Sequence, residues 1–345
     1  MNKLWLLVPL ALAASPALAQ SCVLTGTIKG IGAKPLIFRY VQQGKLYRDT
    51  VRAVNDQFTY TAKPSDSGQI ALIISNPYEQ FWYEPGQITV TGDAAQPSRL
   101  TIVGTPENNV ADRFKREVEW KFDQARQAQP AAAQLKQQEQ QATRQFIKKH
   151  PGSRTAADAL YWQTFANAEL LAEYEQLFGQ LTPAAQHSVQ GQRVAKRLQV
   201  LRHQPAVGRP VPDFSVADTA GTKHSLAAYR GQYVLLDFWG HWCGPCLQAV
   251  PKVKALHTQY AQKLAVIGIA MEDASDAAVW KQTIRKQAIT GLQLSELQQA
   301  NGPVIAGYNV TAFPTYMLLG PSGVLLLRTN DVDDVAKKLA ALGTL

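Results

Sequence analysis

In the C-terminal part of the chain, short apolar runs alternate with longer segments whose apolar residues recur at helical spacing. The runs predict strands near residues 214–217, 233–239, 264–271, 316–319 and 324–328. The longer segments predict helices near residues 245–262, 276–287 and 331–342. This alternation is typical of an α/β sheet with helices on both faces, and Gly320-Pro321-Ser322-Gly323 predicts a hairpin near its end.

The N-terminal half has a different pattern. Between Cys22 and about Gly104, β-type segments separated by turn signals predict a small antiparallel β-sandwich, with strands near residues 23–28, 36–40, 57–61, 70–74 and 88–91. A further cluster of aromatic residues is expected to pack in its core, with a ligand-binding platform as the alternative: Tyr78, Phe81, Trp82 and Tyr83. From about 108 to 203 the composition shifts to Ala, Gln, Lys and Glu and predicts amphipathic helices, in which the Gln-rich segment 124–145 forms a helical pair or mediates homodimerisation.

The first residues have the three regions of a secretory signal peptide. Lys3 precedes an apolar stretch over residues 4–13, and Ser15-Pro16-Ala17-Leu18-Ala19 provides a small-x-small cleavage site. We expect an exported, soluble protein of the periplasmic type. After cleavage, the mature chain should start near Gln20 and have no transmembrane span. The predicted organisation is a signal peptide (1–19), a β-rich module (20–106), a helical linker region (107–207) and an α/β domain (208–345).

Composition narrows the possible functions only slightly. The chain has 345 residues, of which 46% are hydrophobic, so it can bury more than one core. Its net charge of +9 is expected to reflect a solvated basic surface, with a preference for anionic surfaces or acidic partners as the alternative. No basic run interleaved with aromatic residues indicates nucleic-acid binding. Three cysteines are too few for a disulfide-stapled scaffold. Cys22 is expected to be a buried or free thiol, with a lipid anchor or an intermolecular disulfide as the alternatives.

The other two cysteines lie where a predicted strand passes into a predicted helix. Cys243 and Cys246 follow the apolar run 233–239 and precede the helical spacing of 247–256. The N–H groups and dipole at a helix N-terminus stabilise a thiolate, so Cys243 should be the attacking sulfur. Cys246 is expected to be better shielded and to resolve the mixed disulfide. Half of a zinc site and a chance pair of buried cysteines are the alternatives, but no further Cys/His pair is spaced to complete a zinc site.

Around this pair the chain resembles thioredoxin, in Asp237-Phe238-Trp239, Trp242-Cys243-Gly244-Pro245-Cys246 and Pro251. Further on, the segment Tyr308-Asn309-Val310-Thr311-Ala312-Phe313-Pro314-Thr315 is similar to the second landmark of that family. The resemblance implies that Pro314 is a cis-proline facing the disulfide and that Trp242, Phe313 and Pro314 hold the backbone of a substrate.

Two other parts of the chain also resemble known families. The extra residues between Met271 and Phe313 look like the helix-and-strand insert of the TlpA/ResA type of thiol-disulfide oxidoreductases. Residues 84–93 and 103–108 resemble the β-rich N-terminal module of secreted Bacteroidota-type proteins, which has no agreed activity.

The departures from those families concern an acid. TlpA/ResA-type proteins commonly have Asn where this chain has Asp237, and many have Glu where it has Ala249. Thioredoxin pairs its acid with a Lys on the next strand, whereas the expected register places Gly268 there, so that Glu272 and Lys281 are the only guesses for a partner. Among apolar neighbours, the pKa of Asp237 should lie well above its ordinary value, and by analogy it accepts the proton of Cys246.

These features predict an exported thiol-disulfide oxidoreductase without metal or organic cofactor. The Gly-Pro dipeptide resembles that of reducing thioredoxins, so we expect a reductase of protein disulfides that is recharged by a membrane thiol-electron donor. The identity of the substrate stays open. The candidates are apocytochrome c in cytochrome c maturation, another exported protein and a small disulfide. A peroxiredoxin-like peroxidase is one alternative, although Gly240 stands where those enzymes use Thr. A binding or scaffold protein with a vestigial Cys pair is the other.

Overall fold

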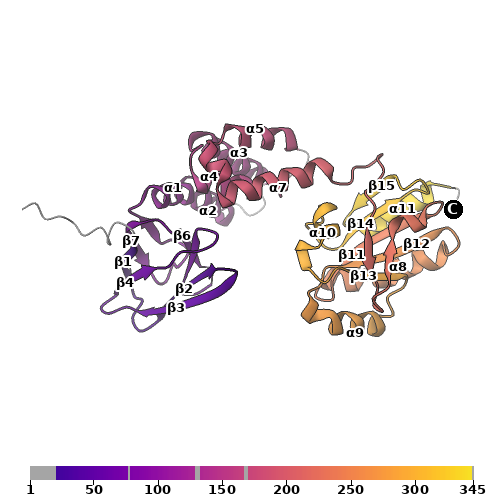
Figure 1. Cartoon of the computed structure of the whole chain (residues 1–345), viewed down its shortest axis with the longest axis horizontal. Helices are drawn as coiled ribbons and strands as arrows, with labels where there is room; N and C mark the ends of the chain where they lie inside the picture. Colours follow the sequence, from indigo (N-terminus) through magenta and orange to yellow (C-terminus); the bar gives the residue numbers. More distant parts are fainter. Residues whose placement is uncertain (1–20, 77, 129–132, 167–169, 344–345) are drawn as a thin grey trace, which may run out of the picture. The chain divides into compact units, whose positions relative to one another are not determined.

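The protein is described by a computed structural model over residues 21–76, 78–128, 133–166 and 170–343 (Figure 1). These residues form two compact units that divide between Arg197 and Leu198. The predicted signal peptide lies outside the described residues. Within the described ranges, no helix combines the length and the apolar character that a membrane-spanning segment needs.

The first unit begins with two four-stranded sheets that pack on each other. One has the order β4-β1-β7-β8 and the other β3-β2-β5-β6. The bounds are β1 (Cys22–Lys29), β2 (Pro35–Gln42), β3 (Lys45–Arg52), β4 (Gln57–Ala62), β5 (Gln69–Ile73), β6 (Glu79–Trp82), β7 (Gly86–Asp93) and β8 (Thr101–Val103). Inward-facing residues such as Leu24, Phe38 and Ile88 form one core between the sheets, which confirms the predicted sandwich.

Two details of the sandwich differ from the prediction. The pair β1 and β7 is parallel, because β7 enters its sheet from β6 of the other sheet and not through a hairpin. The strand β3 carries mostly exposed residues and lacks an apolar face, so the hydrophobic pattern did not indicate it. Phe81 packs in this core, as expected, and Tyr83 packs partly against it. Trp82 is buried outside the core and donates its indole N–H to Thr155, and Tyr78 is exposed, so the expectation is wrong for these two. Cys22 is completely buried at the start of β1, which fits the plain buried thiol.

Helices follow the sandwich, as predicted. Their bounds are α1 (Pro106–Phe114), a π-helix η2 (Lys115–Glu119), α2 (Trp120–Ala128), α3 (Ala133–Lys149), α4 (Arg154–Gln163), α5 (Leu171–Gln180), α6 (Pro183–His187) and α7 (Val189–His203). Helices α2 and α3 pack through Phe122 and Phe146 and are joined by an ion pair of 2.6 Å between Arg126 and Glu139. The Gln-rich segment therefore forms a helical pair, and its role in dimerisation stays a prediction.

Helix α7 passes close to α6 at a glycine. A Cβ atom at Gly191 would lie 2.2 Å from the carbonyl oxygen of Ala185 and 2.3 Å from that of Gln186. Both atoms belong to the backbone, so Gly191→Ala must displace α7 and should destabilise the protein by about 2 kcal/mol or more. Gly179→Ala, on α5 with no atom within 4 Å, is the matched control and should be neutral or stabilising by about 0.5–1 kcal/mol. Urea unfolding of both variants tests the contrast, and equal stabilities would contradict it.

The second unit is built on a five-stranded sheet of order β13-β12-β11-β14-β15. Its strands are β11 (Tyr233–Trp239), β12 (Leu264–Ala270), β13 (Leu292–Ser295), β14 (Thr315–Leu319) and β15 (Leu325–Thr329), and a separate hairpin joins β9 (Ser215–Ala217) to β10 (Lys223–Ser225). Strands β11, β12 and β13 are parallel, whereas β14 and β15 are antiparallel to their neighbours and form the predicted terminal hairpin. The sheet order and helices are those of a thioredoxin-like fold.

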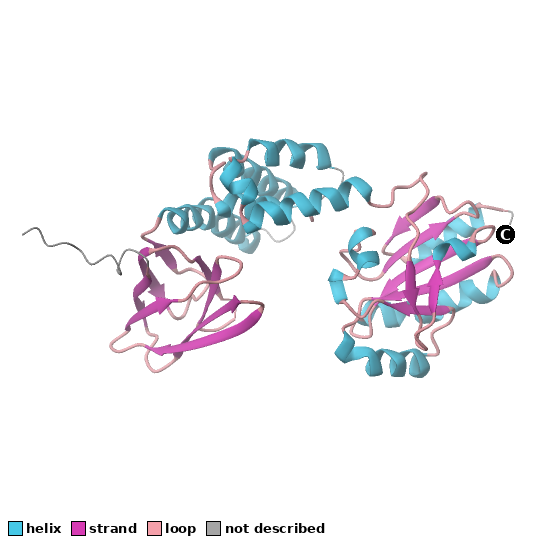
Figure 2. Ribbon diagram, in the orientation of Figure 1, coloured by secondary structure: helices cyan, strands magenta, loops and turns pink. Residues whose placement is uncertain are grey.

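Helices cover both faces of this sheet (Figure 2). They are η4 (Leu226–Tyr229), α8 (Gly244–Gln259), η5 (Ala274–Asp276), α9 (Ala277–Gln287), η6 (Gln299–Asn301), α10 (Pro303–Gly307) and α11 (Val332–Ala341). Alternate residues of β11 face opposite ways: Leu235 packs with α8 and α11, and Leu236 packs with α10 and the segment before β11. Residues 235, 237 and 239 thus lie beneath α8, the helix that carries Cys246.

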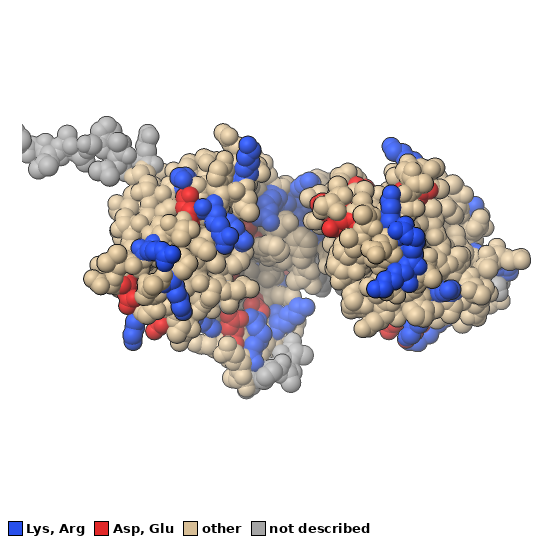
Figure 3. All heavy atoms as spheres, turned by 90° about the horizontal axis from the view of Figure 1, so that it is seen from below, with Lys and Arg blue, Asp and Glu red and all other residues tan. Residues whose placement is uncertain are grey.

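Charged side chains are spread over both units. On the face drawn in Figure 3, Lys and Arg lie on each unit, and Asp and Glu lie among them in smaller groups. A net charge of +9 distributed in this way fits the expected solvated basic surface.

Candidate active site

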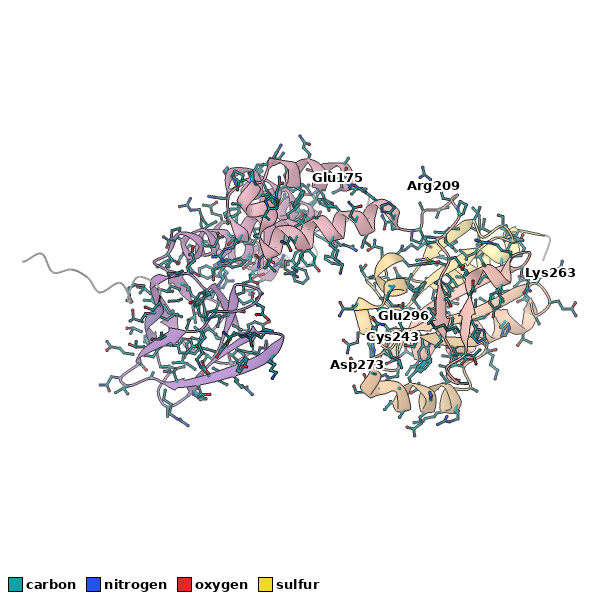
Figure 4. All side chains as sticks on the ribbon, in the orientation of Figure 1. Glu175, Arg209, Cys243, Lys263, Asp273 and Glu296 are labelled. Carbon is teal, nitrogen blue, oxygen red and sulfur yellow. A yellow bond between two sulfur atoms is a disulfide. The ribbon has the colours of Figure 1, made fainter. Side chains whose placement is uncertain are left out.

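The two cysteines of the motif form a disulfide at the end of β11. Their sulfur atoms are 2.03 Å apart, and Cys243 is the N-cap residue of α8 (Figure 4). Its sulfur accepts a hydrogen bond of 3.3 Å from the backbone N–H of Cys246. Trp239, Ala270 and Trp280 surround the pair with apolar surface. The strand-to-helix position predicted from the sequence is confirmed, and a free helix N–H points at the sulfur of Cys243.

The expected difference in shielding between the two cysteines is wrong for the disulfide form. Cys243 is 4% exposed and Cys246 is 5% exposed. Both are enclosed to the same degree because the aromatic residues that pack around the pair cover both sulfurs. What distinguishes them is the helix terminus, which favours the thiolate of Cys243 alone.

After reduction, Cys243 should alkylate faster than Cys246 at neutral pH, by about tenfold or more, because only Cys243 caps the helix. Limited iodoacetamide labelling followed by peptide mass spectrometry measures the ratio. Cys22, buried in the other unit, is the internal reference for an unreactive thiol. Equal labelling of Cys243 and Cys246 would remove the basis for naming the nucleophile.

Three residues that were expected to hold substrate gather beside the disulfide. The Phe313–Pro314 peptide bond is cis, as the resemblance implies. Trp242 is 51% exposed, packs edge-on against Phe313 with ring centroids 5.4 Å apart, and donates its indole N–H to the carbonyl of Met271. Phe313 also packs against the apolar cluster that contains both cysteines. The surface next to the disulfide is therefore aromatic and partly open.

Asp237 lies on β11 beneath α8. The residue is half-buried, its Oδ1 atom is shielded from water, and among the described residues it makes no hydrogen bond or ion pair. Burial raises the pKa of its carboxyl to about 7. This confirms the predicted direction of the shift, and neither Glu272 nor Lys281 serves as its partner.

A glutamine occupies the space beside Asp237 where thioredoxin would carry a lysine. Asp237 pairs with Gly268, as the sequence predicted, and a Cβ atom on Gly268 would lie 2.1 Å from Oε1 of Gln293. The Gln293 amide accepts a hydrogen bond of 3.0 Å from Nε1 of Trp239 and donates one of 2.9 Å to the carbonyl of Thr290. With Gly268 at this position, the amide of Gln293 from the inserted strand β13 fills the space that a side chain at residue 268 would take.

A histidine and a glutamate fix the turn before Cys243. Glu272, fully buried at the end of β12, accepts hydrogen bonds from the backbone N–H of His241 at 2.7 Å and from its Nδ1 at 2.6 Å. Burial raises the pKa of Glu272, and His241 opposes the shift. The sequence analysis missed this pair, although both residues follow adjacent parallel strands whose ends meet at one edge.

Among the described residues, His241 and Glu272 also form one group with Asp276 in which atoms of metal-ligand type lie within 4.8 Å of one another. Both carboxylate oxygens of Glu272 already accept hydrogen bonds from His241. These bonds satisfy the buried carboxylate without an ion.

Two parts of the chain are similar to known protein families. Residues 207–327 match the model of the AhpC/TSA family, and residues 22–111 match a domain of unknown function, DUF4369. The thioredoxin-like protein YneN of Bacillus subtilis is 37% identical over 119 residues, which cover 34% of this chain and 68% of that protein. The thiol-disulfide oxidoreductase ResA of Geobacillus kaustophilus is 30% identical over 142 residues, 40% of this chain and 78% of ResA. The chain belongs to the thioredoxin-like thiol-disulfide oxidoreductases.

A solved structure is similar too. A thiol-disulfide oxidoreductase from Bacteroides fragilis is 29% identical, and the match covers 39% of this chain and 99% of that one with a TM-score of 0.37. As a thiol-disulfide oxidoreductase, the protein is an enzyme that acts on disulfides. The relatives account for about two fifths of the chain, and the DUF4369 match supplies no activity for the first unit.

Proposed function

We propose that this thiol-disulfide oxidoreductase is exported and reduces disulfides of extracytoplasmic proteins through Cys243 and Cys246. The observation that carries the proposal is the placement of Cys243 as N-cap of α8, bonded to Cys246 and flanked by the open aromatic surface of Trp242 and Phe313. The site therefore combines a Cys243 sulfur whose thiolate is stabilised, both as nucleophile and as leaving group, with room for an extended polypeptide.

The exchange balances with the two sulfurs alone. In the reduced enzyme the Cys243 thiolate attacks one sulfur of the substrate disulfide, forms a mixed disulfide and releases the other substrate sulfur as a thiolate. Cys246 loses its proton, attacks the sulfur of Cys243 and releases the second substrate thiol. Two electrons and two protons pass to the substrate, and the enzyme disulfide forms. No metal or organic cofactor enters these steps.

We infer that Asp237, on the face of β11 that α8 covers, accepts the proton of Cys246. A carboxyl with a pKa near 7 changes protonation state at neutral pH, which suits a general base. Phe313 and Pro314, with Trp242, would hold the substrate backbone. A thiol-electron donor in the membrane would then reduce the Cys243–Cys246 disulfide of the enzyme. Apocytochrome c, another exported protein and a small disulfide are the candidate substrates.

The geometry at Gly240 argues against a peroxidase. A Cβ atom at this position would lie 2.6–2.9 Å from the ring of Trp242, so the Thr of a peroxiredoxin-like site would displace this ring from its place over Phe313. Gly240 therefore suits the turn before the cysteines and not a peroxide-binding hydroxyl.

Insulin reduction with dithiothreitol as electron donor tests the proposed function. The protein should accelerate precipitation of the insulin B chain, and Cys243→Ser should abolish this acceleration, while Cys22→Ser should leave it unchanged because Cys22 is buried in the first unit. Activity that survives Cys243→Ser would refute the assignment. Rapid turnover of hydrogen peroxide in place of insulin would favour the peroxidase, and no Cys243-dependent activity would favour the scaffold.

A further inference from the structure

One side chain of the insert reaches the surroundings of the cysteine pair. Gln293, buried on β13, accepts a hydrogen bond of 3.0 Å from Nε1 of Trp239, and its Nε2 donates one of 2.9 Å to the carbonyl of Thr290. Trp239 in turn packs in the apolar cluster that contains Cys243 and Cys246. The amide of Gln293 therefore fixes the position of a ring that covers the disulfide.

The two hydrogen bonds also orient the amide. Because Trp239 offers a donor and Thr290 offers an acceptor, the oxygen of the amide faces Trp239 and its nitrogen faces Thr290. The same oxygen is the atom nearest to the side of Gly268 on which a Cβ atom would lie, at 2.1 Å from that position. The negative end of the amide dipole is therefore directed at the space beside Gly268.

Asp237 borders this space. Gly268 pairs with Asp237 on β11 and with Gln293 on β13, so the two side chains project from the same face of the sheet. Neighbouring strands lie about 4.8 Å apart, which places the amide oxygen about one strand spacing from the Asp237 side chain. Gln293 makes no hydrogen bond to Asp237. An oxygen at this place disfavours the ionised carboxylate and favours its protonated form.

No cation among the described residues opposes this effect. On β14, Tyr316 lies across from Asp237, and burial raises the pKa of its phenol, which is neutral at pH 7. Helix α8 contributes the apolar Ala249 and Val253 and, in the reduced enzyme, the Cys246 thiol. Burial raises the pKa of Asp237, and no charged side chain of the described residues offsets the shift.

We propose that Gln293 is a positioning residue of the thiol exchange. Its amide keeps Trp239 against the cysteine pair and fills, with its negative end, the space from which a cation would stabilise the ionised Asp237. Gln293 thereby lets Asp237 exchange its proton near neutral pH, as a base in the resolving step must. The inference deepens the proposed function and rests on Asp237 as the acceptor of the Cys246 proton.

Titration of the Asp237 carboxyl in Gln293→Lys tests the inference. Carbon NMR of the full chain, labelled at its Asp carboxyl carbons and kept oxidised so that Cys243 and Cys246 do not titrate, follows the signal that Asp237→Asn removes. A cation beside the carboxylate should lower the midpoint by about 1–3 pH units. Gln282→Lys, exposed on α9 of the same insert, adds the same charge and should leave the midpoint at the parent value.

Two further variants separate charge from packing. Gly268→Lys combined with Gln293→Ala removes the amide that a side chain at residue 268 would meet and places an ammonium group there, so it should lower the midpoint as well. Gln293→Met keeps a similar volume without a charge and leaves the N–H of Trp239 unpaired. It should lower the unfolding temperature and move the midpoint far less than either lysine variant.

A midpoint that stays at the parent value in the folded lysine variants overturns the inference and leaves the proposed function standing, because this titration involves no thiol exchange. Where the midpoint falls, quenched-flow measurement of the resolving step should show a pH profile that is lowered by the same amount. A lowered titration midpoint with an unchanged rate profile would instead refute Asp237 as the proton acceptor, and with it the part of Gln293 in the exchange.

Discussion

A Cys246→Ser variant should accumulate a stable mixed disulfide on Cys243, with decay slowed about a thousandfold or more. The reason is that a serine hydroxyl at the position of Cys246 does not displace a thiol at neutral pH, so the intermediate lacks its resolving group. In the structure the two sulfurs are directly bonded, which is the product of the resolving attack. Mass spectrometry of the adduct with a disulfide-containing peptide measures its lifetime.

The control for that experiment is Cys22→Ser, because the Cys22 thiol of the parent protein is completely buried in the sandwich of the first unit. It should form and resolve the adduct at the parent rate. An adduct that decays equally fast on Cys246→Ser and on the parent would show that another group resolves it. The trapped species also identifies physiological substrates, since only proteins attacked by Cys243 remain attached.

An Asp237→Asn variant should leave the first attack nearly intact and slow the resolving step by about tenfold or more, the typical effect of a lost general base. The parent resolving rate should fall as the pH drops below about 7, because a protonated Asp237 cannot accept the Cys246 proton. The variant should lose this pH dependence. Quenched-flow measurement of adduct formation and decay separates the two steps, with the exposed Asp333→Asn on α11 as control. A decay rate unchanged in Asp237→Asn would make the carboxyl structural.

The same carboxyl should make stability depend on pH. Its folded pKa of about 7 lies above the roughly 3.9 of an unfolded Asp, so the unfolded chain releases the proton first. The stability contribution is complete below about pH 4 and is lost as the pH rises through 7, with an upper limit of about 4 kcal/mol because the residue keeps some exposure. Hydrogen exchange of the β11 amides, which reports the second unit, should show this loss in the parent and not in Asp237→Asn.

The pattern of the second unit was readable from the sequence because its strands are short, apolar on both faces and separated by amphipathic helices. The register that places Gly268 beside Asp237 followed from those runs. The occupant of that space could not be derived, since Gln293 lies 25 residues further on and reaches Gly268 only through the pairing of β12 with β13.

Other features of the fold could not be predicted from the sequence for similar reasons. Nothing in the apolar pattern marks β3, whose residues are mostly exposed, and the parallel pairing of β1 with β7 depends on how the chain crosses between two sheets. His241 and Glu272 are 31 residues apart and meet because adjacent parallel strands end together. Short-range spacing placed the cysteines at the strand-to-helix turn, and the resemblance to thioredoxin implied the cis-proline, whereas contacts between distant segments had to come from the fold.

Because Cys22 is completely buried, its thiol is an intrinsic probe of the opening of the first unit. In the oxidised enzyme Cys243 and Cys246 are locked in their disulfide, so Cys22 is the sole thiol that a labelling reagent can find. It becomes reachable only when the sandwich around β1 separates. Its labelling rate relative to that of an unfolded thiol therefore measures the free energy of this opening, without any inserted probe and without interference from the redox site.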